Sequence, residues 1–144
     1  MSSRLVRSTD EATADALDAS QDVAAFLDSW LAGPLFEHLS DEAAARAERL
    51  RNTARGLASS LRSCGTGTQE PLWDVLPSLR APVLALAGSD DSRFAAHAVR
   101  VARLAPSAVA TLVPGGGHAA HLAQPSLTGK VVGHWLDLGR DSRA

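Results

Sequence analysis

Two short segments carry the side chains best suited to chemistry, and each follows an apolar run. One spans Gly88 to Phe94 and the other spans Pro114 to His121. A carboxylate that contacts an imidazole fixes the tautomer and orientation of the ring, which can then act as a base. We select Asp91 and His118 as such a pair. The three glycines before His118 allow a tight backbone approach and leave the ring uncovered.

Each segment also has a plainer interpretation. Asp90 or Asp91 can simply cap the N-terminus of a following helix, and a lone histidine in a loop is commonly structural or solvated. His118 and His121 have the spacing of two metal ligands, but no third ligand at a fitting distance in the sequence is evident. We therefore expect neither a metal nor a cofactor. Two further histidines are expected to be surface or packing residues of helices: His97 and His134.

The second half of the chain has the pattern of a βαβα unit. The predicted elements are a strand over 81–88, a helix over 92–104, a strand over 108–114 and a helix from Pro125 with Leu127, Val131, Trp135 and Leu138 on one face. The first strand is continuously apolar, which is typical of a parallel sheet covered on both faces. Groups that follow such strands gather at one edge of the sheet, so Asp91 and His118 should face each other there. Two strands are too few for a stable sheet, which indicates that other strands come from elsewhere.

The first half of the chain is predicted to be helical. One helix begins after Ser20 as N-cap and ends at Gly33, and a second begins at Ser40 and runs through Arg51. A further helical stretch follows, and residues 65–71 then break the pattern. The first of these helices carries an apolar stripe of Val23, Phe26, Leu27, Trp30 and Leu31.

Composition excludes several classes of protein. The chain has 144 residues with 14 basic and 16 acidic side chains, so its net charge of −2 gives no reason to expect nucleic acid or an anionic membrane as a partner. The single Cys64 excludes an internal disulfide. The first residues are polar where a secretory signal would be apolar, and no run approaches the roughly 20 apolar residues of a membrane span. We expect a cytoplasmic protein.

The order of an acid loop and then a Gly-His loop after successive strands resembles the α/β-hydrolase superfamily. Within it, the chain is most similar to the 2-succinyl-6-hydroxy-2,4-cyclohexadiene-1-carboxylate synthases of menaquinone biosynthesis, which eliminate pyruvate from their substrate. The similar segments are Phe26 to Phe36, Arg51 to Leu61, Gly65 to Leu76, Leu86 to Phe94 and Gly115 to Pro125. The resemblance runs from about Arg4 to Trp135. It implies an α/β fold with a helical lid over 1–78 and the C-terminal part of the hydrolase core over 79–144.

The resemblance also implies roles for individual residues. Asp91 would orient the base, and His118 would be the base. Trp30 falls where the family has a lid tryptophan that faces the substrate, although an anchor on the apolar stripe explains it equally well. Arg7 falls near a family arginine that holds a substrate carboxylate, with Arg4 as the alternative.

The chain departs from the family pattern at the nucleophile. The family places a serine on a Gly-x-Ser-x-Gly turn beside an oxyanion hole, and no serine of this sequence has glycine on both sides at that spacing. Cys64 falls at a predicted helix end, and Trp73 stands where some members have arginine. We interpret the chain as the C-terminal half of an enzyme, through a shortened gene model, a frameshift or a true remnant. Alone it should be catalytically poor.

Three functions fit these observations. The leading one is the pyruvate-eliminating synthase, acting on a small molecule once the N-terminal half completes it. A general ester or carbon–carbon bond hydrolase of the same fold would use the same Asp91–His118 pair. The third is a non-catalytic remnant or helical interaction module that binds a partner through the apolar stripe. Exposed sheet edges would also favour self-association.

Overall fold

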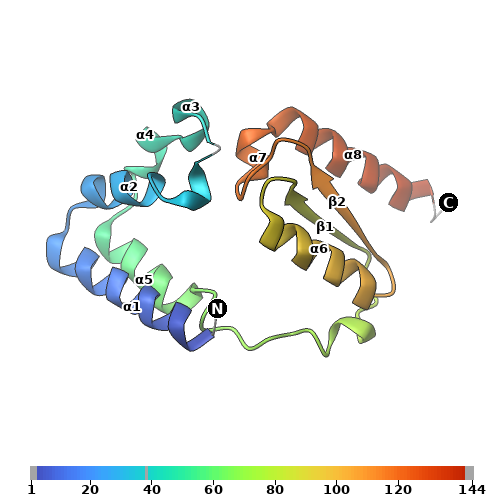
Figure 1. The fold of residues 1–144 in the computed structure, drawn as a ribbon, viewed down its shortest axis with the longest axis horizontal. Coiled ribbons are helices and arrows are strands. Elements are labelled where there is room, and N and C mark those ends of the chain that lie inside the picture. Colours follow the sequence, from blue (N-terminus) through green and yellow to red (C-terminus); the bar gives the residue numbers. More distant parts are fainter. Residues whose placement is uncertain (1–2, 38, 142–144) are drawn as a thin grey trace. The chain divides into compact units, whose positions relative to one another are not determined.

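The computed structural model describes residues 3–37 and 39–141, which form two compact units (Figure 1). Unit 1 comprises Met1–Gly33 and Ala45–Pro71, and unit 2 comprises Pro34–Ala44 and Leu72–Ala144. These units divide the chain at other positions than the expected boundary between lid and core at 78 and 79. The role of the helical part as a lid stays a prediction.

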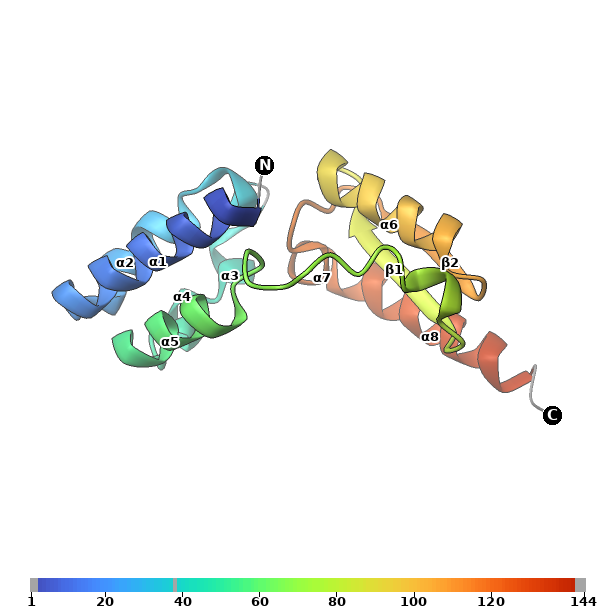
Figure 2. The same cartoon turned by 90° about the horizontal axis from the view of Figure 1, so that it is seen from below.

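Unit 1 is a cluster of helices around a small core. Its helices are α1 (Ser3–Ser20), α2 (Val23–Leu31), α4 (Arg46–Arg49) and α5 (Ala54–Cys64). Helices α1 and α5 lie side by side (Figure 2). Ala14 and Leu17 of α1 meet Ala54 and Ala58 of α5 in a buried cluster, and alanines at such a contact allow a close approach of the two helices. The partly buried residues around this cluster are Val23, Phe26, Leu57 and Leu61.

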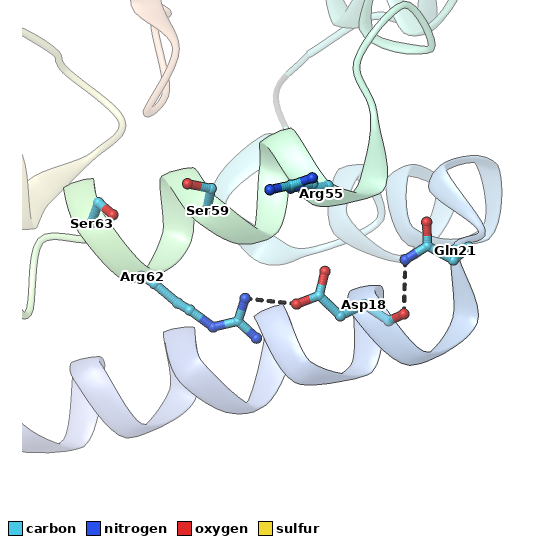
Figure 3. Close-up of a pocket in the computed structure, with 6 residues that line it drawn as sticks. All are labelled: Asp18, Gln21, Arg55, Ser59, Arg62 and Ser63. Carbon is cyan, nitrogen blue, oxygen red and sulfur yellow. Dashed lines mark hydrogen bonds and ion pairs between the residues drawn. The ribbon is translucent and has the colours of Figure 1, made fainter.

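Ion pairs join the helices of unit 1 across its surface. The guanidinium of Arg62 on α5 contacts Asp15 at 2.6 Å and Asp18 at 2.7 Å, both on α1, and Figure 3 shows the contact with Asp18. Arg46 makes two hydrogen bonds, at 2.6 and 3.0 Å, to the carboxylate of Asp28 on α2. Exposed ion pairs are screened by solvent and add little to stability. They therefore favour the alignment of helices that the apolar core already holds together.

The helix boundaries of unit 1 differ from the sequence prediction at α1 and α2. Ser20, expected to cap α2, is instead the last residue of α1. Gln21 follows in the left-handed conformation (φ 53°), and its N–H donates to the carbonyl of Leu17. The N-cap of α2 is Asp22, whose side chain accepts a hydrogen bond from the Ala25 N–H at 2.9 Å. A left-handed residue after the last helical turn is a common helix end, but glutamine gives little sequence signal for it.

The predicted helix from Ser40 to Arg51 is also wrong in part. It is split into α3 (Asp41–Ala44) and α4 by Ala45, which has a positive φ of 49°. The next residue, Arg46, binds Asp28 of α2. Ala45 is also the point where the chain passes from unit 2 into unit 1. A tertiary contact therefore accompanies a break that the alanine-rich sequence does not indicate.

Unit 2 contains a two-stranded parallel sheet. Its elements are the short 3-10 helices at Pro34–Phe36 and Leu76–Ser78, with α3, β1 (Val83–Gly88), α6 (Ser92–Leu104), β2 (Ala108–Val113), α7 (Ala120–Ala123) and α8 (Pro125–Asp141). Helix α6 packs on both strands, and α8 lies on the other side of them (Figure 2). The predicted strand, helix, strand and final helix are confirmed, whereas α7 was not predicted.

The register of the sheet places the ends of β1 and β2 together. Val83 pairs with Ala108 at one end, and Gly88 pairs with Val113 at the other. Within the described residues each strand has one neighbour, and Val109 and Leu112 of β2 are 49% and 41% exposed. On α8, Leu138 is 53% exposed although it was grouped with the apolar face of that helix. Apolar surface is thus left uncovered on this unit.

None of the helices in the described part of the chain is both long enough and apolar enough to cross a membrane.

Candidate active site

The loops after β1 and β2 leave the same edge of the sheet. Gly88 and Val113 are register partners, so the residues that follow them start from neighbouring positions. The Ser89 N–H donates to the Val113 carbonyl at 2.9 Å, and the Asp90 N–H donates to the Gly116 carbonyl at 3.0 Å. The Ser89 hydroxyl accepts a hydrogen bond from the Gly115 N–H at 3.0 Å. These bonds extend the strand pairing and join the two loops.

Glycines make this close approach possible. A Cβ at Gly88 would overlap the carbonyl oxygens of Gly116 and Gly117. Gly115 has a φ of +66°, a conformation that L side chains rarely adopt. A Cβ on Gly116 would lie 2.9 Å from the Cβ of Ala120. The sequence prediction that the three glycines before His118 allow a tight approach is confirmed, and Gly88 is an additional requirement that it missed.

Asp91 and His118 meet at this edge. Nδ1 of His118 lies 2.8 Å from Oδ2 of Asp91. The other carboxylate oxygen, Oδ1, accepts a hydrogen bond from the Phe94 N–H at 3.1 Å, and Asp91 is the N-cap of α6. Asp91 therefore caps the helix with one oxygen and contacts His118 with the other, and its catalytic role stays a prediction. The capping bond at Oδ1 holds the carboxylate in place, and Oδ2 holds the imidazole.

Electrostatics determine which nitrogen of His118 carries the proton. Burial acts to raise the pKa of Asp91, but the Phe94 N–H, the hydrogen bond and charge of His118, and the charge of Arg93 together hold that pKa below its ordinary value. The carboxylate is therefore ionised near neutral pH and can only accept hydrogen bonds. In the neutral imidazole Nδ1 of His118 must then be the donor, which leaves the lone pair on Nε2. This is the arrangement that a general base needs.

The lowered pKa of Asp91 predicts a pH dependence of stability. A carboxyl whose pKa is lower in the folded state stabilises the fold above its unfolded pKa of about 3.9, and this contribution is lost as the pH falls through the lower folded value. We expect Asp91→Asn to reduce the loss in unfolding free energy between pH 6 and pH 3, as measured by urea denaturation. Asp90→Asn, at a carboxyl that hydrogen-bonds Ser89 instead, is the control. Identical pH profiles for wild type and Asp91→Asn would contradict the argument.

The imidazole of His118 borders a small pocket. Its side chain is 32% exposed, whereas that of Asp91 is 12% exposed. Within the described residues Nε2 of His118 has no hydrogen-bond partner. The pocket has a volume of about 150 Å³ and is lined by Pro34, Leu35, Glu37, Asp90, Asp91, Ser92, Arg93, Gly117 and His118. Typical small-molecule sites are about 300–1,000 Å³, so this pocket would enclose only part of a substrate.

The other residues singled out from the sequence lie elsewhere. Arg7 is exposed on α1, and Trp30 on α2 is 38% exposed with its ring 5.6 Å from that of Phe26. Both belong to unit 1, and their roles in substrate binding stay predictions. The exposed Cys64 is a free thiol at the end of α5. The described part of the chain shows no group of three or more potential metal-binding side chains.

The apolar stripe on α2 is partly used within unit 1. Leu27 is 4% exposed, and Val23 and Phe26 pack against the buried cluster of α1 and α5. Of the remaining histidines, His97 contacts the rings of Trp73 and Phe94, while His121 and His134 are exposed.

Sequence reasoning placed Phe94 in the loop after the first strand but gave it no role, and it missed the residues that reach the pocket from elsewhere in the sequence. Phe94 lies beside His118, with ring centroids 4.7 Å apart and the planes at 67°. Its position three residues after the N-cap Asp91 was a usable signal, because that residue's N–H is the usual partner of a capping side chain. Pro34, Leu35 and Glu37 reach the pocket from a distant part of the sequence. No local pattern identifies them.

Comparison with known proteins agrees with this architecture. No protein-family model matches the sequence. A Bacillus subtilis (strain 168) protein assigned as 2-succinyl-6-hydroxy-2,4-cyclohexadiene-1-carboxylate synthase is 38% identical over 117 residues, which cover 78% of this chain and 43% of that protein. The synthase of the same name from Photorhabdus laumondii subsp. laumondii is 31% identical over 121 residues, covering 83% and 42% respectively.

A solved structure extends the match to three dimensions. The structure of MenH from S. aureus superposes with a TM-score of 0.89 at 29% identity, over 96% of this chain and 53% of that one. This chain is related to the C-terminal part of these synthases. Its fold is accordingly the C-terminal portion of an α/β-hydrolase, as the sequence predicted. The chain spans less than half the length of each curated relative.

Proposed function

We propose that this chain supplies the acid–base half of a 2-succinyl-6-hydroxy-2,4-cyclohexadiene-1-carboxylate synthase. The observation that carries the proposal is the 2.8 Å contact between Asp91 and Nδ1 of His118 at the ends of two parallel strands. The relatives named for this reaction match across about four fifths of the chain, 78% and 83%. In this proposal Asp91 orients His118, and Nε2 faces the reacting groups.

The chemistry of the reaction fits such a pair. In an elimination that releases pyruvate, a base removes a proton from carbon while the carbon–oxygen bond to the leaving group breaks. The leaving enolate then takes up a proton to become pyruvate. A histidine whose Nδ1 is held by a carboxylate can accept a proton at Nε2 directly or through a serine hydroxyl, and can then return it. The activity therefore makes the enzyme a lyase, although the pair itself is also that of a hydrolase.

The rest of the site comes from outside this chain in our proposal. The serine and the oxyanion-hole donors of the α/β-hydrolase fold belong to the portion that the relatives have and this chain does not match. We propose that strands of that portion pair with the outer edges of β1 and β2 and cover apolar residues such as Val109 and Leu112. Without them, exposed edges would favour self-association of two copies.

We propose substrate-binding roles for two further residues, as the resemblance implies. Arg7 would bind a carboxylate of the substrate and Trp30 would contact the substrate, with the segment over 1–78 acting as the lid. Arg7 is exposed and Trp30 is 38% exposed. We also propose a cytoplasmic location, in which the exposed free thiol of Cys64 would stay reduced.

A chimera tests this function. It joins the N-terminal part of the Bacillus subtilis relative, which this chain does not match, to the 144 residues of this chain. We expect the purified chimera to release pyruvate from the menaquinone precursor that the synthases use, measured by coupled reduction with lactate dehydrogenase. The unjoined chain, assayed at the same concentration, is the control.

The chimera also separates the synthase from the alternative hydrolase. Simple aryl esters are offered to the same preparation, and the release of the aryl alcohol is followed. Turnover of the esters without release of pyruvate would support the general hydrolase and overturn the synthase proposal.

A further inference from the structure

Phe94 contacts both members of the Asp91–His118 pair. Its backbone N–H donates to Oδ1 of Asp91 at 3.1 Å. Its ring meets the imidazole of His118 edge to face, with centroids 4.7 Å apart, which is within the preferred range of about 4.5–7 Å for aromatic pairs.

The ring of Phe94 also contacts a second aromatic ring. His97, one turn along α6, lies edge to face with Phe94 at 5.7 Å. The ring of Trp73 lies 5.6 Å from His97, and the guanidinium of Arg100 lies 3.9 Å over the Trp73 ring. A continuous row of rings therefore runs along α6 from Trp73 to His118. Helical spacing of 94, 97 and 100 places these residues on one face.

His118 needs a second constraint because one hydrogen bond does not fix a ring. Rotation about χ2 of histidine is broad and roughly twofold, so the imidazole can pivot about its bond to Asp91 or turn over and present a carbon instead. A ring packed against its flank limits both motions. Asp91 fixes where Nδ1 lies, and a neighbour at the position of Phe94 fixes where Nε2 points.

We propose that Phe94 is a positioning residue for His118, and that His97 and Trp73 hold it in place. This inference rests on the proposed function for its catalytic meaning, since it assumes that His118 is the base. The geometric part concerns the ring orientation alone and can be tested without turnover.

The test uses the chain itself and nuclear magnetic resonance of its histidine ring nitrogens. In the wild type we expect His118 to be the Nδ1–H tautomer and to show cross-relaxation with the ring protons of Phe94. Phe94→Leu keeps the N–H that caps Asp91 and most of the apolar volume but removes the ring. We expect it to raise the fraction of the Nε2–H tautomer at least threefold. Phe94→Tyr, which keeps the ring, should restore the wild-type tautomer, and Phe26→Leu in unit 1 is the matched control.

Activity in the chimera gives the second measurement. With substrate binding unchanged, misorientation of the base should lower kcat about tenfold or more while KM changes less than twofold. Phe94→Tyr should stay within twofold of wild type in both.

The outcomes separate this inference from the proposed function. An active wild-type chimera in which Phe94→Leu leaves the tautomer and kcat unchanged overturns the inference and leaves the function standing. A tautomer shift in Phe94→Leu with an inactive wild-type chimera supports the positioning role and overturns the function. If Phe94→Leu does not fold, the test is the cross-relaxation between the His118 and Phe94 rings of the wild type. Its absence overturns the inference.

Discussion

Replacing His118 with alanine is expected to lower kcat/KM of the chimera by at least about 10³-fold, because removal of the base from a triad costs that much or more. The side chain lies at the surface of the site with 32% of its area exposed, so its loss leaves little cavity. The structure of the variant should therefore persist while the activity disappears. The comparison uses initial rates of pyruvate release over substrate concentrations below and above KM, with circular dichroism of the same sample.

A neighbouring histidine provides the control for this loss. His121 is exposed on α7, three residues further along the chain. We expect His121→Ala to retain kcat/KM within about twofold, since exposed side chains away from the reacting groups have small effects. If His121→Ala were the inactive variant and His118→Ala the active one, the assignment of the base would be wrong.

Gly88→Ala is expected to destabilise unit 2 by about 3 kcal/mol, in the range of severe overpacking. The added methyl group would overlap the carbonyl oxygens of Gly116 and Gly117. Both are backbone atoms, and the Gly116 carbonyl is held by the Asp90 N–H. A flexible side chain could move aside, whereas here the loop that carries His118 must shift. Urea denaturation followed by circular dichroism measures the change.

Gly129 offers the matched substitution with the opposite sign. It lies in α8, and a Cβ built there meets nothing within 4 Å. Gly129→Ala should therefore stabilise the chain by about 0.5–1 kcal/mol through helix propensity alone. Equal effects of the two substitutions would show that the loops after β1 and β2 do not approach as closely as described. A shift of the His118 ring signals in Gly88→Ala should accompany the loss of stability.

The part of the fold that sequence reasoning predicted is the part in which local pattern and tertiary structure agree. The run over 81–88 is short, apolar without interruption and bounded by turn residues, which favours a strand, and β1 forms over Val83–Gly88. The helix expected from about Ser92 to Leu104 is α6, with Asp91 as its N-cap. Because parallel strands share one edge, the contact of Asp91 with His118 followed from the order of these elements.

The features that were missed depend on contacts between distant residues. Ala45 adopts a left-handed conformation that an alanine-rich helix gives no reason to expect. The sequence identifies Gly88 only as the end of a strand. The structure is needed to show that a side chain at this position would overlap the Gly116 carbonyl. Phe94 reads as an apolar residue of a helix, and its ring acquires a role only through His118. Propensity and spacing describe neighbours along the chain, and these roles belong to neighbours in space.

One oxygen of Asp91 caps α6 and the other contacts His118, and this has a consequence for mutational surveys. A library selected only for abundance of folded protein would reject most replacements at position 91, because they release the first turn of α6. The same position would also be rejected in a selection for turnover, so intolerance there would not by itself reveal a catalytic function. Asparagine is the informative replacement, since its amide oxygen can still cap the helix while the charge that holds the imidazole is gone.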